Sequence, residues 1–346
     1  MAKWVVAGVL SVSTVAWLAV PPGMMPTPAD RESTPDASAT QSRLAALARA
    51  SIFRPAGSGT TPSLPEVLSC RYVDKPVSGT TPKFDCTLDN GDRIRVKYGS
   101  VEWKGEVAAT RLLSATGFGA DTVSMAQRLR CYGCPSWPYQ TRQISERLHV
   151  EPFFEGRIDY DDYTDFTSVS VERRGQHKEL EFGDQEGWGF HELSAIDPSV
   201  GGAPRDEVDA LRLMAVFLNH WDNKPSNQSL LCVDDDCEHP LAMIQDAGST
   251  FGPKKVDLDR WRDTPVWAEA TGCRVTMKHL PYDGGTFVDV EISEGGRRLL
   301  AAKLQKITRN QIRELLSDAQ LEPIDAWVAA FDRRLDAIAR RAPCPS

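Results

Sequence analysis

A short polar segment, "HWDNKPSN" (220–227), directly follows a stretch with the pattern of an apolar helix. It gathers a histidine, an aspartate, a lysine and two asparagines, and "DAGSTFG" (246–252) later places another aspartate before a glycine. Each segment alone is typical of a polar turn. Together they supply carboxylate and amide oxygens, which Mg²⁺ prefers as ligands, and a lysine that can contact phosphate. The two segments therefore predict a nucleotide and metal site.

The first half of the chain carries strand patterns. Strands are expected at 67–73, 83–88, 93–99, 122–131 and 167–174, where apolar and polar residues alternate or β-formers gather. "DNGD" (89–92) is a tight-turn signal between two of them. A helix is expected to begin at Ser100 as its N-cap and to end at Gly117. "GWGFHEL" (187–193) is expected to be a further strand leading out of the sheet.

The second half carries helix patterns. Segment 205–218 places apolar residues on one helical face, and "TRNQ" (308–311) is a capping box that opens another helix. A final helix has a stripe formed by Trp327, Phe331, Leu335 and Ile338. The expected fold class is α+β, with a β-rich N-terminal lobe over residues 63–195 and a mainly helical lobe over residues 196–346.

The N-terminus has the layout of a secretory signal. Residues 1–20 contain one basic residue, Lys3, followed by an apolar run. An uncleaved signal anchor is the alternative, and it would attach the protein to a membrane. Residues 21–62 are rich in Pro, Ser and Thr, which predicts a disordered linker with a short helix near 42–53. We therefore expect an exported protein, either periplasmic or extracellular, with anchoring in the inner membrane left open.

Eight cysteines follow this segment, and an even number in an exported chain indicates disulfides. Proximity in sequence favours four pairs: Cys70–Cys86, Cys131–Cys134, Cys232–Cys237 and Cys273–Cys344. This is one of about 105 pairings that eight cysteines allow. "CYGC" (131–134) also fits a redox motif, or a zinc site shared with "CVDDDC" (232–237). Pro135 and Pro138 predict a loop after it, so structural disulfides are preferred.

The net charge of −8 argues against a nucleic-acid partner, because neutralising phosphates requires a basic surface. No run rich in Lys and Arg interrupts this pattern. The bound partners expected instead are a nucleotide and a hydroxyl-bearing acceptor, whose identity the sequence leaves open.

Four motifs resemble the protein-kinase superfamily. "HWDNKPSN" resembles its catalytic loop, commonly written HRDLKPEN, and "DAG" (246–248) resembles its metal-binding DFG. Lys97 in "RVKYG" resembles the lysine of the third strand, and Glu106 in the following helix resembles its ion-pair partner, with Glu102 as a rival. The elements also occur in the kinase order over residues 63–252. The resemblance implies a bilobal kinase-like fold.

The resemblance also implies roles. Catalysis falls to Asp222, which would orient or deprotonate the acceptor hydroxyl, and to Lys224 near the γ-phosphate. Lys97, positioned by Glu106, would contact the inner phosphates of ATP, and Gly79 would lie in the turn that covers the phosphates. Asn227 and Asp246 would hold Mg²⁺, with Mn²⁺ as a substitute. Segment 187–193 would lie at the linker beside the adenine.

Three departures place the chain in an atypical branch. The covering turn has one glycine, Trp221 replaces the arginine of HRD, and Ala247 replaces the phenylalanine of DFG. The chain resembles HipA-like and secretory-pathway kinases, and a group of exported bacterial proteins that share "GEVAATRLL" and "DNKP".

The expected function is transfer of a phosphoryl group from ATP to a hydroxyl. A non-catalytic kinase-like binding module is the alternative, because ATP is scarce outside the cell. A zinc or thiol–disulfide protein centred on Cys131 and Cys134 is a third hypothesis.

Overall fold

The computed structural model describes residues 37–55, 64–77, 79–149, 158–174, 178–280 and 285–344. The predicted signal or anchor (1–20) and residues 21–36 and 56–63 of the predicted linker lie outside these ranges. Residues 37–55 pack against the rest of the molecule: α1 (Ala37–Ala48) is followed by a segment in which Ser51 bridges to Leu241. Within the described ranges, every helix is too short or too polar to cross a bilayer.

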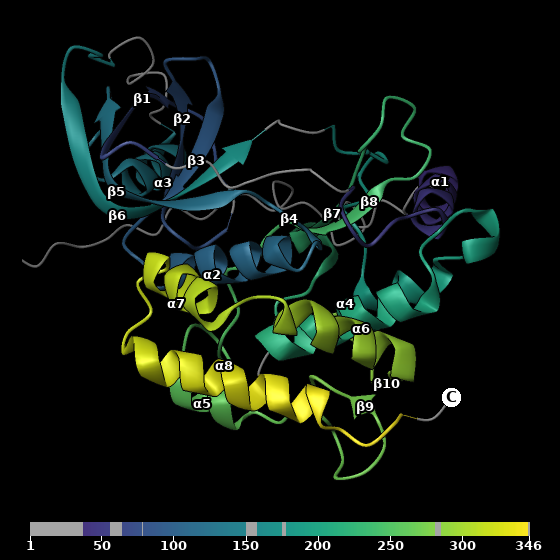
Figure 1. Cartoon of the computed structure of the whole chain (residues 1–346). Helices are drawn as coiled ribbons and strands as arrows, with labels where there is room; N and C mark the ends of the chain where they lie inside the picture. The colour runs from purple at the N-terminus through teal and green to yellow at the C-terminus, as the bar shows by residue number, and fades with distance from the viewer. Residues whose placement is uncertain are drawn as a thin grey trace, which may run out of the picture.

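A five-stranded closed barrel is formed by the first half of the chain (Figure 1). The strands are β1 (Val67–Val73), β2 (Lys83–Leu88), β3 (Arg93–Lys97), β5 (Val123–Tyr132) and β6 (Tyr163–Arg174). They follow the order β1-β2-β3-β6-β5, and β5 closes the barrel by pairing in parallel with β1. Alternate residues such as Ile94 and Val96 are fully buried inside it. All five predicted strands are therefore confirmed.

Two smaller sheets lie outside the barrel. One has the order β4-β8-β7, formed by Gly119–Ala120, Leu241–Ile244 and Gln228–Leu231, and the other pairs β9 (Arg274–Val275) with β10 (Val290–Glu291). The remaining α-helices are α2 (Glu102–Ala115), α3 (Pro138–Leu148), α4 (Arg205–Leu218), α5 (Leu258–Asp263), α6 (Glu294–Gln305), α7 (Arg309–Asp318) and α8 (Ile324–Ala339). The α+β class is thus confirmed.

Two hydrophobic cores hold these elements together. One fills the barrel, and the other joins α2 to α4, α6, α7 and α8. Figure 1 shows α2 below the barrel, with α7 and α8 on its far side. Since α2 directly follows β3 and belongs to the second core, it connects the barrel to the helices.

Local signals explain where several helices begin. The Ser100 hydroxyl accepts a hydrogen bond from the Glu102 amide, and Gly117, with φ +86°, follows the end of α2. Thr308 and Gln311 form the predicted capping box of α7. The predicted helix at 205–218 is α4. These three expectations are confirmed.

Two expectations were wrong. Segment 187–193 is not a strand, because a 3₁₀ helix, η3 (Phe190–Ala195), begins within it. Glu192 exchanges hydrogen bonds with the backbone of Gly189 and also pairs with Arg43, which stabilises that turn. Pro138 does not continue a loop either, since it begins α3. Proline suits this first helical position, where its missing N–H would have no partner.

The four disulfides have the pairing that sequence proximity favours. Cys70–Cys86 and Cys131–Cys134 lie in the barrel, Cys232–Cys237 clips the β7–β8 connection, and Cys273–Cys344 ties the C-terminus to the helical part. Four such bonds are typical of proteins from oxidising compartments.

Candidate active site

Lys97, the last residue of β3, is the central cation of the site. Its Nζ lies 2.5 Å from Glu106 Oε1 on α2 and 3.5 Å from Asp246 Oδ2. Lys97 is only 3 % exposed and Glu106 is fully buried, so this pair is shielded from solvent. Glu102, the rival partner, is engaged elsewhere: its carboxylate accepts from Thr81 and pairs with Lys255. The structure thus joins β3, α2 and the "DAG" segment at one lysine.

Negative charge exceeds positive charge around Lys97. Burial raises the pKa of Glu106 to about 7, against the opposing effect of Lys97, and the Asp246 and Glu172 carboxylates raise it further. Burial also acts to raise the pKa of Asp246, but Lys97, the Gly248 amide and Lys83 outweigh it and lower that pKa to about 2. Asp246 is therefore ionised at neutral pH and is the carboxylate best suited to hold a cation.

Loop 220–227 begins where α4 ends. Asn219, with φ +54°, adopts the left-handed conformation and reverses the chain. His220 is fully buried, and Asp222, with a 22 % exposed side chain, lies beyond it. The Asp222 Oδ1 is 3.7 Å from the Lys224 Nζ. Burial raises the pKa of Asp222, and Lys224 and Asn227 oppose this rise.

Asn227 and Asp246 lie beside each other at the ends of β7 and β8. The Asn227 carbonyl accepts hydrogen bonds from the amides of Gln245 and Asp246. The Asn227 side chain donates Nδ2–H to the Asp222 carbonyl at 2.6 Å. Among the described residues, no donor contacts its Oδ1. One amide oxygen and one ionised carboxylate are thus available together, which fits a Mg²⁺ or Mn²⁺ ion.

Gly79 lies in the turn before β2, beside a second lysine. A Cβ at Gly79 would lie 3.1 Å from the Lys83 Nζ, and its φ of +84° suits glycine. Lys83 pairs in register with Lys97 across β2 and β3, and burial together with Lys97 lowers its pKa. The sequence prediction missed Lys83. The strand register, once assigned, would have placed the two lysines side by side.

Asn223 was also missed, although it makes the most contacts in the loop. It is 1 % exposed, and its Oδ1 accepts from the backbone amides of Thr286 and Phe287 at 2.6 and 2.9 Å. Its Nδ2 donates to the His220 carbonyl at 2.8 Å. The Thr286 hydroxyl donates to the Asn223 carbonyl and accepts from the Phe190 amide. Asn223 therefore fixes the backbone on both sides of Asp222.

Segment 187–193 does not offer an aromatic surface. Trp188 and Phe190 are buried in the large core, where the Trp188 indole donates to the Ser229 carbonyl at 3.0 Å. The rings therefore support the linker from inside, and stacking on an adenine would require other groups.

Comparison with known proteins gives structural similarities only. No family model and no curated protein matches the chain. Three solved structures do. The Helicobacter pylori proinflammatory kinase CtkA is 12 % identical, with 78 % of this chain and 95 % of that chain covered at a TM-score of 0.46.

The Golgi casein kinase with Mn/ADP bound is 13 % identical, with 88 % and 75 % of the two chains covered at a TM-score of 0.35. HipA from Shewanella oneidensis MR-1, solved with HipB and operator DNA, is 11 % identical, with 84 % and 68 % covered at 0.35. The chain is similar to kinases. The resemblance stated from its motifs is confirmed to that extent, and the function is inferred below from the geometry of the site.

Proposed function

We propose that the protein is an atypical kinase that transfers a phosphoryl group from ATP to a hydroxyl acceptor with Mg²⁺. The observation that carries this proposal is the convergence of Lys97, Glu106, Asp246 and Asn227 from four separate elements. Phosphoryl transfer needs little beyond a cation on the phosphates, oxygen ligands for a metal, and a group that orients the acceptor.

Each residue has a part in this scheme. Lys97, fixed by Glu106, binds the inner phosphates, and Lys83 adds positive charge beside it under the Gly79 turn. Asn227 and Asp246 hold Mg²⁺, which when bound neutralises phosphate charge. Asp222 accepts the proton of the acceptor hydroxyl, and Lys224 lies close enough to stabilise charge on the transferred group.

The four disulfides support an exported protein, in the periplasm or outside the cell. In such a compartment ATP is scarce. A non-catalytic kinase-like module that binds nucleotide is therefore the competing proposal. The two share a ligand and differ in turnover.

The first test measures thermal unfolding of the oxidised protein with and without ATP and Mg²⁺. Ligand at about one hundred times its Kd should stabilise the native state by about 2.7 kcal/mol. We expect this shift to require both ligands, to vanish in Asp246→Ala and to persist in Asp235→Ala, which changes an exposed aspartate of the 232–237 loop. A shift that survives Asp246→Ala would overturn the assigned metal site.

The second test measures turnover of ATP with a panel of hydroxyl acceptors. We expect Asp222→Asn to lower kcat about 10²- to 10⁴-fold, as loss of a general base does, while the ligand-induced shift remains. Because burial raises the pKa of Asp222, activity should fall as pH drops through that pKa. Binding without turnover at any pH would favour the non-catalytic module.

A further inference from the structure

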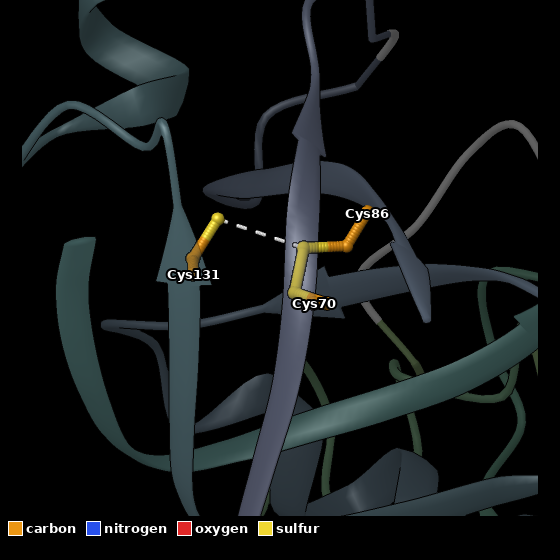
Figure 2. Close-up of side chains that lie close together, drawn as sticks. All are labelled: Cys70, Cys86 and Cys131. Carbon is orange, nitrogen blue, oxygen red and sulfur yellow. Dashed lines mark hydrogen bonds between the residues drawn. A yellow bond between two sulfur atoms is a disulfide. The ribbon is translucent and has the colours of Figure 1, made fainter. Parts of the chain in front are cut away.

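Two disulfides lie side by side inside the barrel. Cys70 on β1 is bonded to Cys86 on β2, and Cys131 at the end of β5 is bonded to Cys134 in the turn that follows. The Cys86 Sγ is 3.6 Å from the Cys131 Sγ, the contact drawn as a dashed line in Figure 2. The sulfurs of Cys70, Cys86 and Cys131 all lie within 4.8 Å of one another.

Barrel closure creates this cluster. The parallel pairing of β5 with β1 places Cys131 opposite Cys70, and the β1–β2 hairpin brings Cys86 next to Tyr72, two residues further along β1. Cys70, Cys86 and Cys131 are at most 1 % exposed. Three strands therefore direct cysteine side chains to one point in the barrel core.

The spacing of these sulfurs fits tetrahedral zinc. A Zn–S bond of about 2.3 Å puts neighbouring sulfurs of a tetrahedral site about 3.8 Å apart. The observed 3.6 Å between Cys86 and Cys131 is close to this value. Cys131 and Cys134 form a C-x-x-C arm, and Gly133 at φ +78° provides the turn between them. A side chain at Gly133 would collide with Ile158 and Tyr160.

A cavity gives access to the cluster. It has a volume of about 280 Å³ and is lined by Cys134, Gly133 and Pro135 together with three aspartates, Asp74, Asp159 and Asp162. Cys134, at 9 % exposed, is the member of the cluster that faces this cavity. The aspartates favour a cation at the entrance. A small reductant can also reach the Cys134 sulfur by this route.

We propose that Cys70, Cys86, Cys131 and Cys134 bind one Zn²⁺ when their two disulfides are reduced. Each disulfide takes two electrons and two protons from a dithiol, which becomes a cyclic disulfide, and yields two thiols. Zn²⁺ then binds four thiolates and releases four protons. Oxidation of the thiolates to the two disulfides returns the ion. This site is independent of the kinase proposal, because its ligands are separate from the residues around Lys97.

The structure also decides which cysteines take part. The zinc alternative expected from the sequence combined Cys131 and Cys134 with Cys232 and Cys237. These last two are bonded to each other outside the barrel, and Cys232 belongs to none of the barrel core. They serve as the matched control pair.

The test reduces the full chain with a phosphine, which does not compete for metal as a dithiol does, and adds Zn²⁺ or Co²⁺. We expect one zinc per reduced chain and none at this site in the oxidised chain. Co²⁺ should give the intense visible bands of tetrahedral thiolate coordination. Cys134→Ser should weaken binding at least about tenfold, while the Cys232→Ser/Cys237→Ser double variant should still bind one ion.

Circular dichroism of the reduced chain, with and without Zn²⁺, tests whether the barrel persists. We expect zinc to raise the midpoint of thermal unfolding of the reduced chain and not of the oxidised chain. The proposal is overturned if reduced protein binds no zinc, if zinc fails to stabilise it, or if Cys134→Ser binds as tightly as the control variant. An octahedral Co²⁺ spectrum would also exclude the thiolate site.

Discussion

Lys97 and the carboxylates around it carry the chemistry of the candidate site. A buried lysine without partners would lose its charge, but here Glu106, Asp246 and Glu172 keep its pKa above the ordinary value. The same arrangement leaves Glu106 with an Oε2 that has no hydrogen-bond donor among the described residues. A site with surplus negative charge is prepared for a divalent cation.

Glu106 and His220 should have opposite effects on stability as pH changes. The folded pKa of Glu106 is raised to about 7, so its contribution to the free energy of unfolding falls as pH rises from its unfolded pKa toward 7. Burial lowers the pKa of His220 to about 4, so its contribution rises with pH from about 4 toward its unfolded pKa. Each slope approaches about 1.4 kcal/mol per pH unit where one proton is exchanged.

We therefore predict that Glu106→Gln makes stability rise more steeply between pH 4.5 and 6.5, and that His220→Leu makes it fall, relative to wild type. Urea unfolding at a series of pH values measures both slopes. Parallel curves for wild type and Glu106→Gln would show that Glu106 is ionised throughout this range.

Asn223 should act as a positioning residue for Asp222. Asn223→Ala leaves the Thr286 and Phe287 amides without an acceptor, at a cost of about 1–3 kcal/mol for each buried group. We expect kcat to fall up to about 100-fold, because displacement of a reacting group by 1 Å has that effect. The KM for ATP should change little.

Steady-state kinetics of Asn223→Ala, with exposed Asn310→Ala as control, separates kcat from KM. A rise in KM with unchanged kcat would instead place Asn223 in nucleotide binding.

At the scale of elements, the end of α4 determines where the loop begins. Arg334 on α8 holds this end: its guanidinium donates to the carbonyls of Val216, Phe217, Trp261 and Thr264 at 2.6–3.1 Å. The residue is 2 % exposed. Four carbonyls from α4 and α5 thus share one cation, which joins three helices just before His220.

Arg334→Met should destabilise the protein by about 3 kcal/mol or more, because several buried carbonyls lose their donor. Arg340→Met, on the same helix and exposed, should change stability by less than about 0.5 kcal/mol. Chemical denaturation of both variants checks this. Equal, small effects would mean that water replaces the guanidinium.

At the scale of the molecule, the disulfides differ in how much chain they close. Cys273–Cys344 spans 71 residues, whereas Cys232–Cys237 spans 5. In the chain-entropy model, a longer closed loop restricts the unfolded state more. The bond at the C-terminus should therefore contribute more to stability than the clip on the β7–β8 connection.

We predict that Cys273→Ser/Cys344→Ser costs about 4 kcal/mol and Cys232→Ser/Cys237→Ser about 2 kcal/mol. Denaturant unfolding of the two double variants under oxidising conditions measures the difference. A larger loss from the short clip would show that local packing around β7 and β8 dominates.

Local interactions made much of this fold predictable from sequence. Alternation of apolar residues identified β2 and β3, and the Thr308 capping box located the start of α7, because strand faces and helix caps depend on near neighbours. The spacing within 220–227 identified Asp222 and Asn227 as candidates for the same reason. These are properties of a few consecutive residues.

Tertiary packing decided the rest. Whether Glu106 or Glu102 pairs with Lys97 depends on how α2 rotates against β3, and Gly105 allows the close approach of α2 to Gly248. Asn223 finds Thr286 across 63 residues, and Cys131 meets Cys86 only because the barrel closes. Such contacts arise from burial of distant surfaces against each other, and no short stretch of sequence encodes that outcome.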